Sequence, residues 1–193
     1  MKSNEFIQIM QNKVAVSAVG PSALSGQGKG VLSATQTFLA KVNLTKIQKI
    51  EHRQFEIWFD RQTESLLDKL PLKNRPWGAA RKATNLFLRD ALYNRYLCLH
   101  FKINKIESML EVPLDCVIAL SLKRIEKRGQ LPSWPGLKWL RKPASNQFQL
   151  FANEIAMKKK INRVHIDMYL WLENRKTMPN DCVDSGPGKR CHF

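Results

Sequence analysis

The chain has 193 residues, of which 44% are hydrophobic, so it can bury one sizeable core and is expected to form a single domain. Its 32 Lys and Arg residues against 16 Asp and Glu residues give a formal charge of +16, which favours a polyanionic partner, with nucleic acid ahead of a membrane surface. The sequence contains no apolar run of about 18 residues, and its polar beginning is unlike a secretory signal, so we expect no membrane association and a location in the cytoplasm, at the nucleoid.

Segment 14–30 is rich in Gly and Ser and lacks a helical or strand period, which predicts a turn-rich loop. Its glycines would let the backbone approach a ligand closely, so Ser25 and Gln27 are candidates for a base pocket or a phosphate contact, the alternative being an ordinary surface loop. A short helix is expected over 31–42, and a longer one over 47–70 whose aromatic residues at helical spacing predict core positions.

Residues 75–78, Arg-Pro-Trp-Gly, predict a tight turn between two helices, because proline cannot continue a preceding helix and glycine tolerates unusual backbone angles. A long amphipathic helix is expected from Ala79, and its first turn carries Arg81 and Lys82. Free amides at such a helix start favour a phosphate or a developing negative charge. The alternative is a helical hairpin with a solvated basic end. The apolar face of this helix is predicted to contain Leu88, Leu92, Tyr96 and Leu99.

Asp115 follows Pro113 and precedes an apolar run, so it is expected to cap a helix that continues to about residue 127. A capping role alone is the ordinary interpretation of such an aspartate. A second interpretation is chemical, because cleavage of a base from deoxyribose builds positive charge on the sugar, which an ionised carboxylate stabilises. A lysine held near such a carboxylate and among other cations can attack the sugar carbon and form a Schiff base, and Lys82 is flanked by Arg81.

Segment 128–143 places three prolines and two tryptophans in a basic run, which predicts an ordered loop with aromatic faces. Aromatic side chains among cations suit a nucleic-acid surface, because a displaced base stacks while the cations hold phosphates. Trp134 and Trp139 are the stacking candidates, and Lys138 and Arg141 are the cations. The alternative, that the tryptophans fill a groove between helices, is favoured more for Trp139 than for Trp134.

Two further helices are expected in the C-terminal part of the sequence. The first covers 146–160 and is predicted to be capped by Ser145. The second follows the break at Asn162; Asp167 is predicted to cap it, with His165 preceding it near the cleft. Residues 178–193 are expected to form a disordered tail. The four cysteines do not supply a metal-ligand set, so neither a metal nor another cofactor is expected.

The central motifs together resemble the helix-hairpin-helix DNA glycosylase superfamily, and most closely its archaeal GO glycosylase branch, which acts on 8-oxoguanine. The matching residues are Arg81-Lys82, Asn85, Leu114-Asp115-Cys116-Val117 and, near the end of the chain, Val164-His165-Ile166-Asp167-Met168-Tyr169-Leu170-Trp171. The resemblance implies that Lys82 is the nucleophile and Asp115 the catalytic carboxylate. The family hairpin usually carries two glycines, whereas this chain has Gly78 followed by two alanines.

The predicted fold is therefore all-α, with six to eight helices in two lobes, a cleft between them, and a helix-hairpin-helix-like element at about 70–100 within a glycosylase-like domain over 1–177. The predicted DNA contacts are Arg75, Trp77, Gly78, Arg81, Lys138 and Arg141, and the predicted base-pocket residues are Ser25, Gln27, Trp134, His165 and Asp167.

The first functional hypothesis is a monomeric DNA glycosylase, with or without lyase activity, that acts on double-stranded DNA and flips out the target base. Its substrate is either an oxidised purine or a hypermodified cytosine of phage DNA, the latter implying anti-phage defence. The second hypothesis is a DNA-binding module without chemistry. The third is an RNA-binding protein, because positive charge alone binds both nucleic acids.

Overall fold

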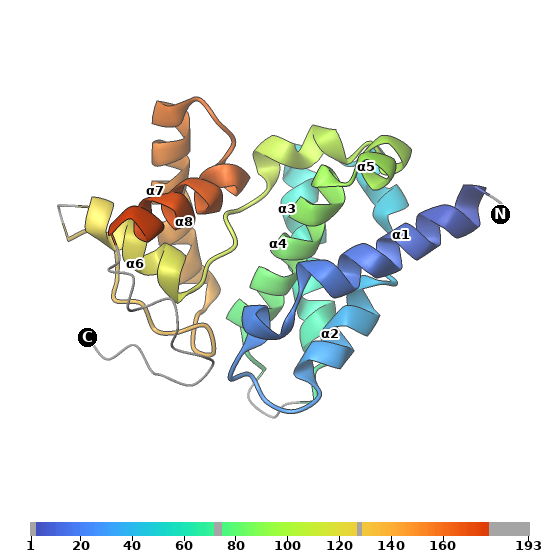
Figure 1. Cartoon of the computed structure of the whole chain (residues 1–193), viewed down its shortest axis with the longest axis horizontal. Helices are drawn as coiled ribbons and strands as arrows, with labels where there is room; N and C mark the ends of the chain where they lie inside the picture. Colours follow the sequence, from blue (N-terminus) through green and yellow to red (C-terminus); the bar gives the residue numbers. More distant parts are fainter. Residues whose placement is uncertain (1–2, 72–74, 127–128, 178–193) are drawn as a thin grey trace.

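The computed structural model describes residues 3–71, 75–126 and 129–177, and these residues form eight α-helices and four short 3-10 segments without any β-strand (Figure 1). The predicted all-α class is confirmed, with more helical segments than the six to eight expected. The α-helices are α1 (Ser3–Ala18), α2 (Val31–Leu39), α3 (His52–Leu67), α4 (Trp77–Tyr93), α5 (Arg95–Phe101), α6 (Cys116–Ile125), α7 (Lys142–Lys159) and α8 (Ile166–Thr177). The 3-10 segments are η1 (Pro21–Leu24), η2 (Leu44–Lys49), η3 (Ile103–Met109) and η4 (Arg163–His165).

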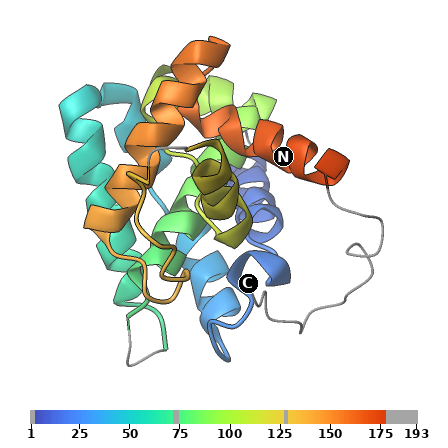
Figure 2. The same cartoon turned by 90° about the vertical axis from the view of Figure 1, so that its left-hand side faces the viewer.

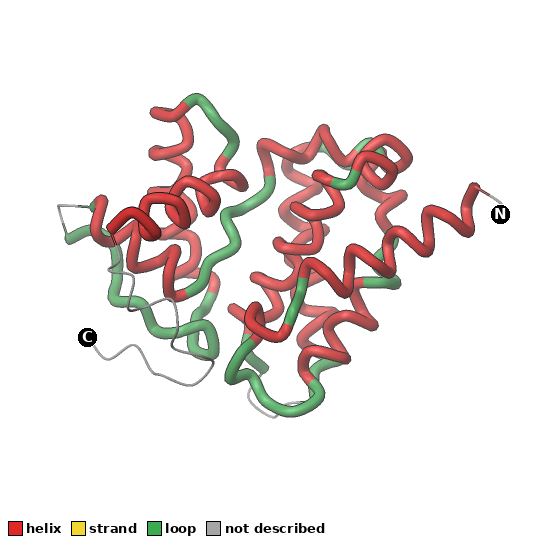
Figure 3. The backbone as a smooth tube through the Cα atoms, viewed as in Figure 1, coloured by secondary structure: helices red, strands yellow, loops and turns green. Residues whose placement is uncertain are grey.

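The helices gather into two lobes that are joined by an extended segment, 110–115. Figure 1 shows α1 to α5 on one side and α6 to α8 on the other, and Figure 2 shows the molecule from the side of α6 to α8. Figure 3 shows the loop that crosses between the two lobes. Helix α4 packs against α1, α2, α3 and α5, and it also contacts α7 of the second lobe. Because α4 is buried without interruption from Trp77 to Leu88, it is the central element of the fold and positions the side chains that point towards the second lobe.

Helix α4 begins two residues earlier than the sequence predicted, at Trp77, so Trp77 and Gly78 belong to the helix and not to a turn. Gly78 lies against the loop that precedes α7: a Cβ atom placed there would be 2.5 Å from the Leu137 carbonyl oxygen and 2.7 Å from the Leu140 Cβ. The missing side chain thus allows a close approach between two segments of the protein. The prediction of a Pro-Trp-Gly turn facing DNA was wrong for this reason.

The expected long helix from Ala79 ends at Tyr93, where Asn94 adopts an extended conformation. The Asn94 side-chain oxygen accepts hydrogen bonds from the backbone amides of Tyr96 and Leu97, both at 3.1 Å, and so begins a new helix, α5, in another direction. Tyr96 and Leu99 are consequently 54% and 69% exposed. Their predicted place on the apolar face of α4 was wrong, because the helical period does not continue through the break.

Other boundaries also differ from the prediction. Helix α1 includes residues as far as Ala18, so the first part of segment 14–30 is helical and contributes to the core. Helix α3 begins at His52 instead of residue 47, because Glu51 and Gln54 form a capping box there. Ser145 is buried inside α7, which begins at Lys142, so Ser145 is not the cap of that helix. The predicted disordered tail, 178–193, lies outside the described residues.

Candidate active site between the two lobes

Lys82 and Asp115 lie 33 residues apart in the chain and meet between the lobes. The Lys82 Nζ atom donates a hydrogen bond to Asp115 Oδ2 at 3.2 Å. Lys82 sits on the second turn of α4, and its side chain is only 9% exposed. Two side chains that the sequence selected for their chemistry are therefore in direct contact.

Asp115 is held in place by a second hydrogen bond. Its Oδ1 atom accepts a hydrogen bond from the backbone amide of Ile118 at 2.9 Å, which makes Asp115 the N-cap of α6, as predicted. One carboxylate oxygen thus fixes the side chain to a helix end, while the other faces the Lys82 ammonium group. This arrangement orients the carboxylate without using both of its oxygens for structure.

The ion pair forms part of the lining of a pocket of about 660 Å³. The lining comes from η1 and α4 in the first lobe, from α6 and α8 in the second, and from the segment 110–115 that joins the lobes. It is predominantly apolar, with a few charged groups, as is usual for pockets that bind small organic molecules. The lining residues are Ser22, Ala23, Lys82, Leu86, Arg89, Pro113, Asp115, Val117, Ile118, Asp167, Met168, Trp171 and Leu172.

A second ion pair, between Arg89 and Asp167, faces the same pocket. Both side chains are mostly buried, and Arg89 is seven residues after Lys82, so the two cations lie on one face of α4. Asp167 Oδ2 bonds to Arg89, whereas Asp167 Oδ1 is buried without a hydrogen-bond partner among the described residues. Burial raises the pKa of Asp167, and the nearby Arg89 opposes that effect. Asp167 lies within the first turn of α8, which begins at Ile166, so the prediction that it caps this helix was wrong.

Arg81 points away from the pocket into the interior. It forms a bidentate ion pair with Glu111, at 2.9 and 2.6 Å, and a further ion pair with Asp60 at 2.9 Å. Its guanidinium carbon lies 3.6 Å from the centre of the Phe59 ring. Since every face of this guanidinium is engaged and Trp77 beside it is also buried, the predictions that Trp77, Gly78 and Arg81 contact DNA were wrong.

The other predicted DNA-contacting cations are exposed. Arg75 forms an ion pair with Asp68, in which both side chains remain largely open to solvent. Lys138 and Arg141 lie on the loop before α7 and are exposed, without an ion-pair partner among the described residues. These cations remain candidates for contact with phosphate groups.

Several predicted base-pocket residues lie elsewhere. Ser25 and Gln27 are in the loop after η1 and do not line the pocket; their neighbours Ser22 and Ala23 do. Trp134 packs edge-on against Phe148 at 5.6 Å between ring centres, so it contributes to the core of the second lobe. Of the predicted pocket residues, Asp167 is the one that the structure places in the lining.

His165 takes part in a separate network that links the lobes. Its Nδ1 atom is 2.7 Å from the Tyr93 hydroxyl oxygen, and its Nε2 atom is 2.7 Å from Glu107 Oε1. The hydrogen bond from His165 lowers the pKa of Glu107, and burial raises the pKa of Tyr93 to about 12. Because both ring nitrogens are engaged and His165 is outside the pocket lining, the prediction that it contacts the base was wrong.

Comparisons of this chain with protein-family models, curated proteins and solved structures found no match. The geometry therefore carries the functional argument. Within 3–71, 75–126 and 129–177, no group of three or more His, Cys, Asp or Glu side chains is arranged to hold a metal ion. None of the helices in the same ranges is both long and apolar enough to cross a bilayer. Cys182, Cys191 and His192 lie outside the described residues.

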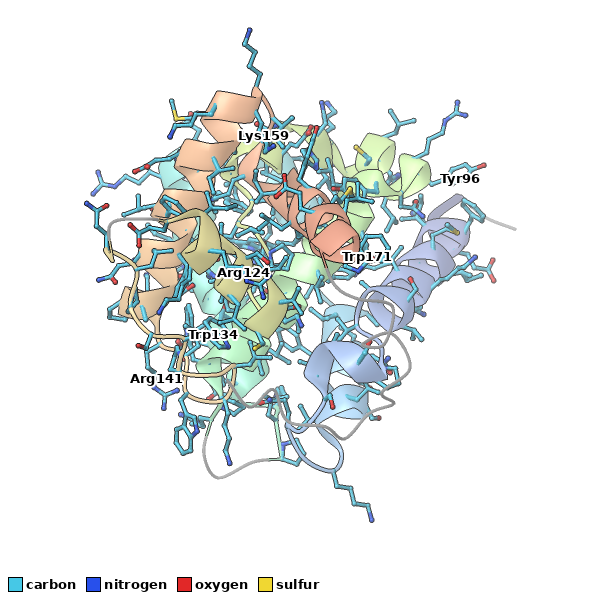
Figure 4. All side chains as sticks on the ribbon, turned by 60° about the vertical axis from the view of Figure 1, so that its left-hand side comes forward. Tyr96, Arg124, Trp134, Arg141, Lys159 and Trp171 are labelled. Atoms are coloured by element: carbon cyan, nitrogen blue, oxygen red, sulfur yellow. The ribbon has the colours of Figure 1, made fainter. Side chains whose placement is uncertain are left out.

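Sequence reasoning did not assign Arg89 or Trp171 to the site. The seven-residue spacing from Lys82 was the available signal for Arg89, because residues at that spacing share a helix face. The signal for Trp171 was its position four residues after Asp167, which places both side chains on one side of α8. Figure 4 shows Trp171 on α8, well separated from Tyr96 and α5.

Proposed function

We propose that this protein is a DNA glycosylase that binds a flipped-out base in the pocket between its lobes and cleaves the N-glycosidic bond with Lys82 and Asp115. The observation that carries the proposal is the 3.2 Å contact between these two side chains in the pocket lining. A mostly buried lysine beside an oriented carboxylate is the arrangement that attack on a sugar carbon requires. The formal charge of +16 agrees with a polyanionic substrate.

The proposed reaction begins when Asp115 accepts a proton from Lys82, which frees the lone pair on Nζ. That lone pair attacks C1′ of the target nucleotide, the C1′–N bond breaks, and its electron pair leaves with the base. Asp115 returns the proton to the departing base and, again ionised, stabilises the positive charge on the sugar. The attack leaves Nζ as an ammonium group with two protons. One of these protons passes to O4′ as the C1′–O4′ bond breaks, and the Nζ lone pair that it frees forms the C=N bond, which leaves a protonated Schiff base between Lys82 and C1′.

The remaining pocket groups are suited to holding a base. The buried Asp167 Oδ1 atom has an unused acceptor position and could accept a hydrogen bond from a ring or exocyclic N–H. Trp171, half exposed in the lining, offers an aromatic face for stacking. A volume of about 660 Å³ is in the range that encloses drug-sized ligands, so the pocket has room for a base with a bulky substituent. The proposed substrates remain an oxidised purine and a hypermodified cytosine.

The decisive experiment incubates the protein with DNAs that contain normal bases, uracil, 8-oxoguanine, alkylated bases or glucosylated hydroxymethylcytosine. Base release is scored as alkali-labile breaks, and binding is measured in parallel. We expect release from one modified DNA and none from the unmodified control. If the protein binds every DNA and releases no base from any of them, the glycosylase proposal is refuted.

A DNA-binding module without chemistry is the second candidate. The exposed cations Lys138 and Arg141 favour it, because they are available for phosphate contacts independently of the pocket. This alternative predicts that substitution of Lys82 or Asp115 changes neither the affinity nor the salt dependence of DNA binding. It takes precedence if the panel gives binding without base release.

A further inference from the structure

Trp139 is an exposed tryptophan on a surface loop. The sequence favoured a groove-filling role more for Trp139 than for Trp134, and the structure shows the reverse. Trp139 is 58% exposed, whereas Trp134 is packed against the core. The Lys138 Nζ atom lies 5.2 Å from the centre of the Trp139 ring, and Arg141 is exposed two residues later. An exposed aromatic ring between two cations combines the two groups that single-stranded nucleic acid binds, a face for base stacking and positive charge for phosphates.

The loop that carries Trp139 has a defined conformation. Gly136 adopts φ +81°, and its carbonyl oxygen accepts hydrogen bonds from the amides of Trp139, at 3.1 Å, and Leu140, at 3.0 Å. The side chain of Leu140 is buried, so Trp139, its neighbour in this tight turn, is directed outward. A side chain on such a turn loses little conformational freedom when it binds a ligand.

The same turn is attached to the helix that carries Lys82. Leu137 and Leu140 contact Gly78 so closely that no Cβ fits at that position. Gly78 is one helical turn before Lys82, and Leu140 and Lys82 both line a very small internal cavity. After the turn, Lys142 Nζ is 2.5 Å from Asp60 Oδ2, which ties the beginning of α7 to α3. The position of Trp139 is therefore coupled to the frame of the candidate active site.

We propose that Trp139, with Lys138 and Arg141, is a nucleic-acid contact outside the pocket, at which the indole stacks on an unpaired base while the two cations bind the flanking phosphates. The inference rests on the proposed function only for its ligand class, DNA. Stacking is insensitive to base identity, so this contact recognises unpaired structure and not sequence. The hairpin glycine Gly78 is packed against Leu137 and Leu140 and cannot contact a phosphate. Lys138 and Arg141 would supply the phosphate contact instead.

The test measures the affinity of the full chain for a labelled duplex that contains one unpaired nucleotide and for the same duplex fully paired. Trp139→Ala is expected to weaken binding to the first duplex by about 5- to 150-fold, with a smaller effect on the second. Trp139→Phe, which retains an aromatic face, should recover most of the loss. The matched control is Tyr169→Ala, because Tyr169 is also an exposed aromatic residue beneath a lysine, with Lys159 Nζ 5.0 Å from its ring.

The cations are tested by the salt dependence of binding. The double variant Lys138→Gln and Arg141→Gln is expected to reduce the magnitude of the slope of log affinity against log salt by about 1.8 on the paired duplex, whereas Lys159→Gln leaves it unchanged. Equal affinities of the wild type and Trp139→Ala for the duplex with the unpaired nucleotide would overturn the inference. The inference would also be overturned if Trp139→Ala lost binding to anionic vesicles and kept wild-type binding to DNA, since tryptophan and lysine also suit a membrane surface.

These outcomes are distinct from failure of the proposed function. Binding is measured without any chemical step, so a protein that releases no base can still show the Trp139 effect. Conversely, a protein that releases a base and binds DNA equally well with Trp139→Ala refutes this inference and leaves the glycosylase proposal intact. Because Trp139 is exposed, the variant is expected to fold, which thermal denaturation verifies.

Discussion

Replacing Asp115 with asparagine separates the two roles of this side chain. Asparagine retains an oxygen that can accept the hydrogen bond from the Ile118 amide, which is 2.9 Å from Asp115 Oδ1, and it caps helices as well as aspartate does. The second oxygen, however, becomes an NH₂ group 3.2 Å from the Lys82 ammonium group. The substitution therefore keeps the cap of α6 and removes the negative charge that the proposed reaction requires.

The expected effect on catalysis is large. Loss of an oriented group that stabilises transition-state charge lowers the rate of base release by about 10²- to 10³-fold, or roughly 2.7–4 kcal/mol. The effect on folding is smaller: the mostly buried Lys82 loses its hydrogen-bond partner, at a cost of about 1–3 kcal/mol. Asp115→Ala loses the same partner and also the cap, which costs about 1 kcal/mol more and lowers the melting temperature by a further 2–4 °C or so.

The assay is single-turnover base release from the DNA identified in the panel, with enzyme in excess, together with DNA affinity and thermal denaturation of both variants. Asp115→Asn should bind DNA at least as well as the wild type, because it removes a negative charge from a surface that receives a polyanion. The assignment is refuted if Asp115→Asn releases the base at nearly the wild-type rate. Equal melting temperatures of the two variants would contradict the capping role.

Three further predictions test neighbouring parts of the structure. If Lys82 forms a Schiff base, borohydride should trap the wild-type protein covalently on its substrate DNA and should trap no Lys82→Met protein. Base release by the wild type without an adduct would show that Lys82 is the ion-pair partner of Asp115 and not the nucleophile. The folded state lowers the pKa of Glu107, so its contribution to stability is present above the ordinary pKa of about 4.3 and is lost as pH falls below that value. Acid should therefore lower the melting temperature more for the wild type than for Glu107→Gln. Equal decreases in the melting temperature of the two proteins below about pH 4 would contradict this. Gly78→Ala should destabilise the protein by about 1–3 kcal/mol, because its Cβ would meet the Leu137 carbonyl, and denaturant unfolding with no change in midpoint would show that the two segments separate easily.

Local patterns were sufficient to predict several features of this protein. The helical period and the absence of long alternating segments indicated an all-α fold, which the structure has. The order Pro113, Leu114, Asp115 before an apolar run identified the N-cap of α6, because a cap is formed by residues within a few positions of each other. Boundaries were less predictable: the end of α4 depends on one side chain, Asn94, that starts a new helix.

The candidate site needed a different kind of information. Lys82 and Asp115 were selected from the motif around each, but their 3.2 Å contact depends on how α4 packs against the beginning of α6. The ion pair between Arg89 and Asp167 could not be predicted from the sequence, since the two residues are 78 positions apart and become partners only when α8 packs beside the pocket.

The sequence by itself determined a basic protein with a helical period, which made nucleic acid the expected ligand, and its motifs selected Lys82 and Asp115. They did not distinguish the cations that face solvent from those that the fold consumes. Arg81 is neutralised by Asp60 and Glu111, 21 and 30 residues away, whereas Lys138 and Arg141 form no ion pair among the described residues and stay exposed. Burial is decided by partners that are distant in sequence, because the cost of desolvating a charge is offset only where folding brings an opposite charge within hydrogen-bonding distance.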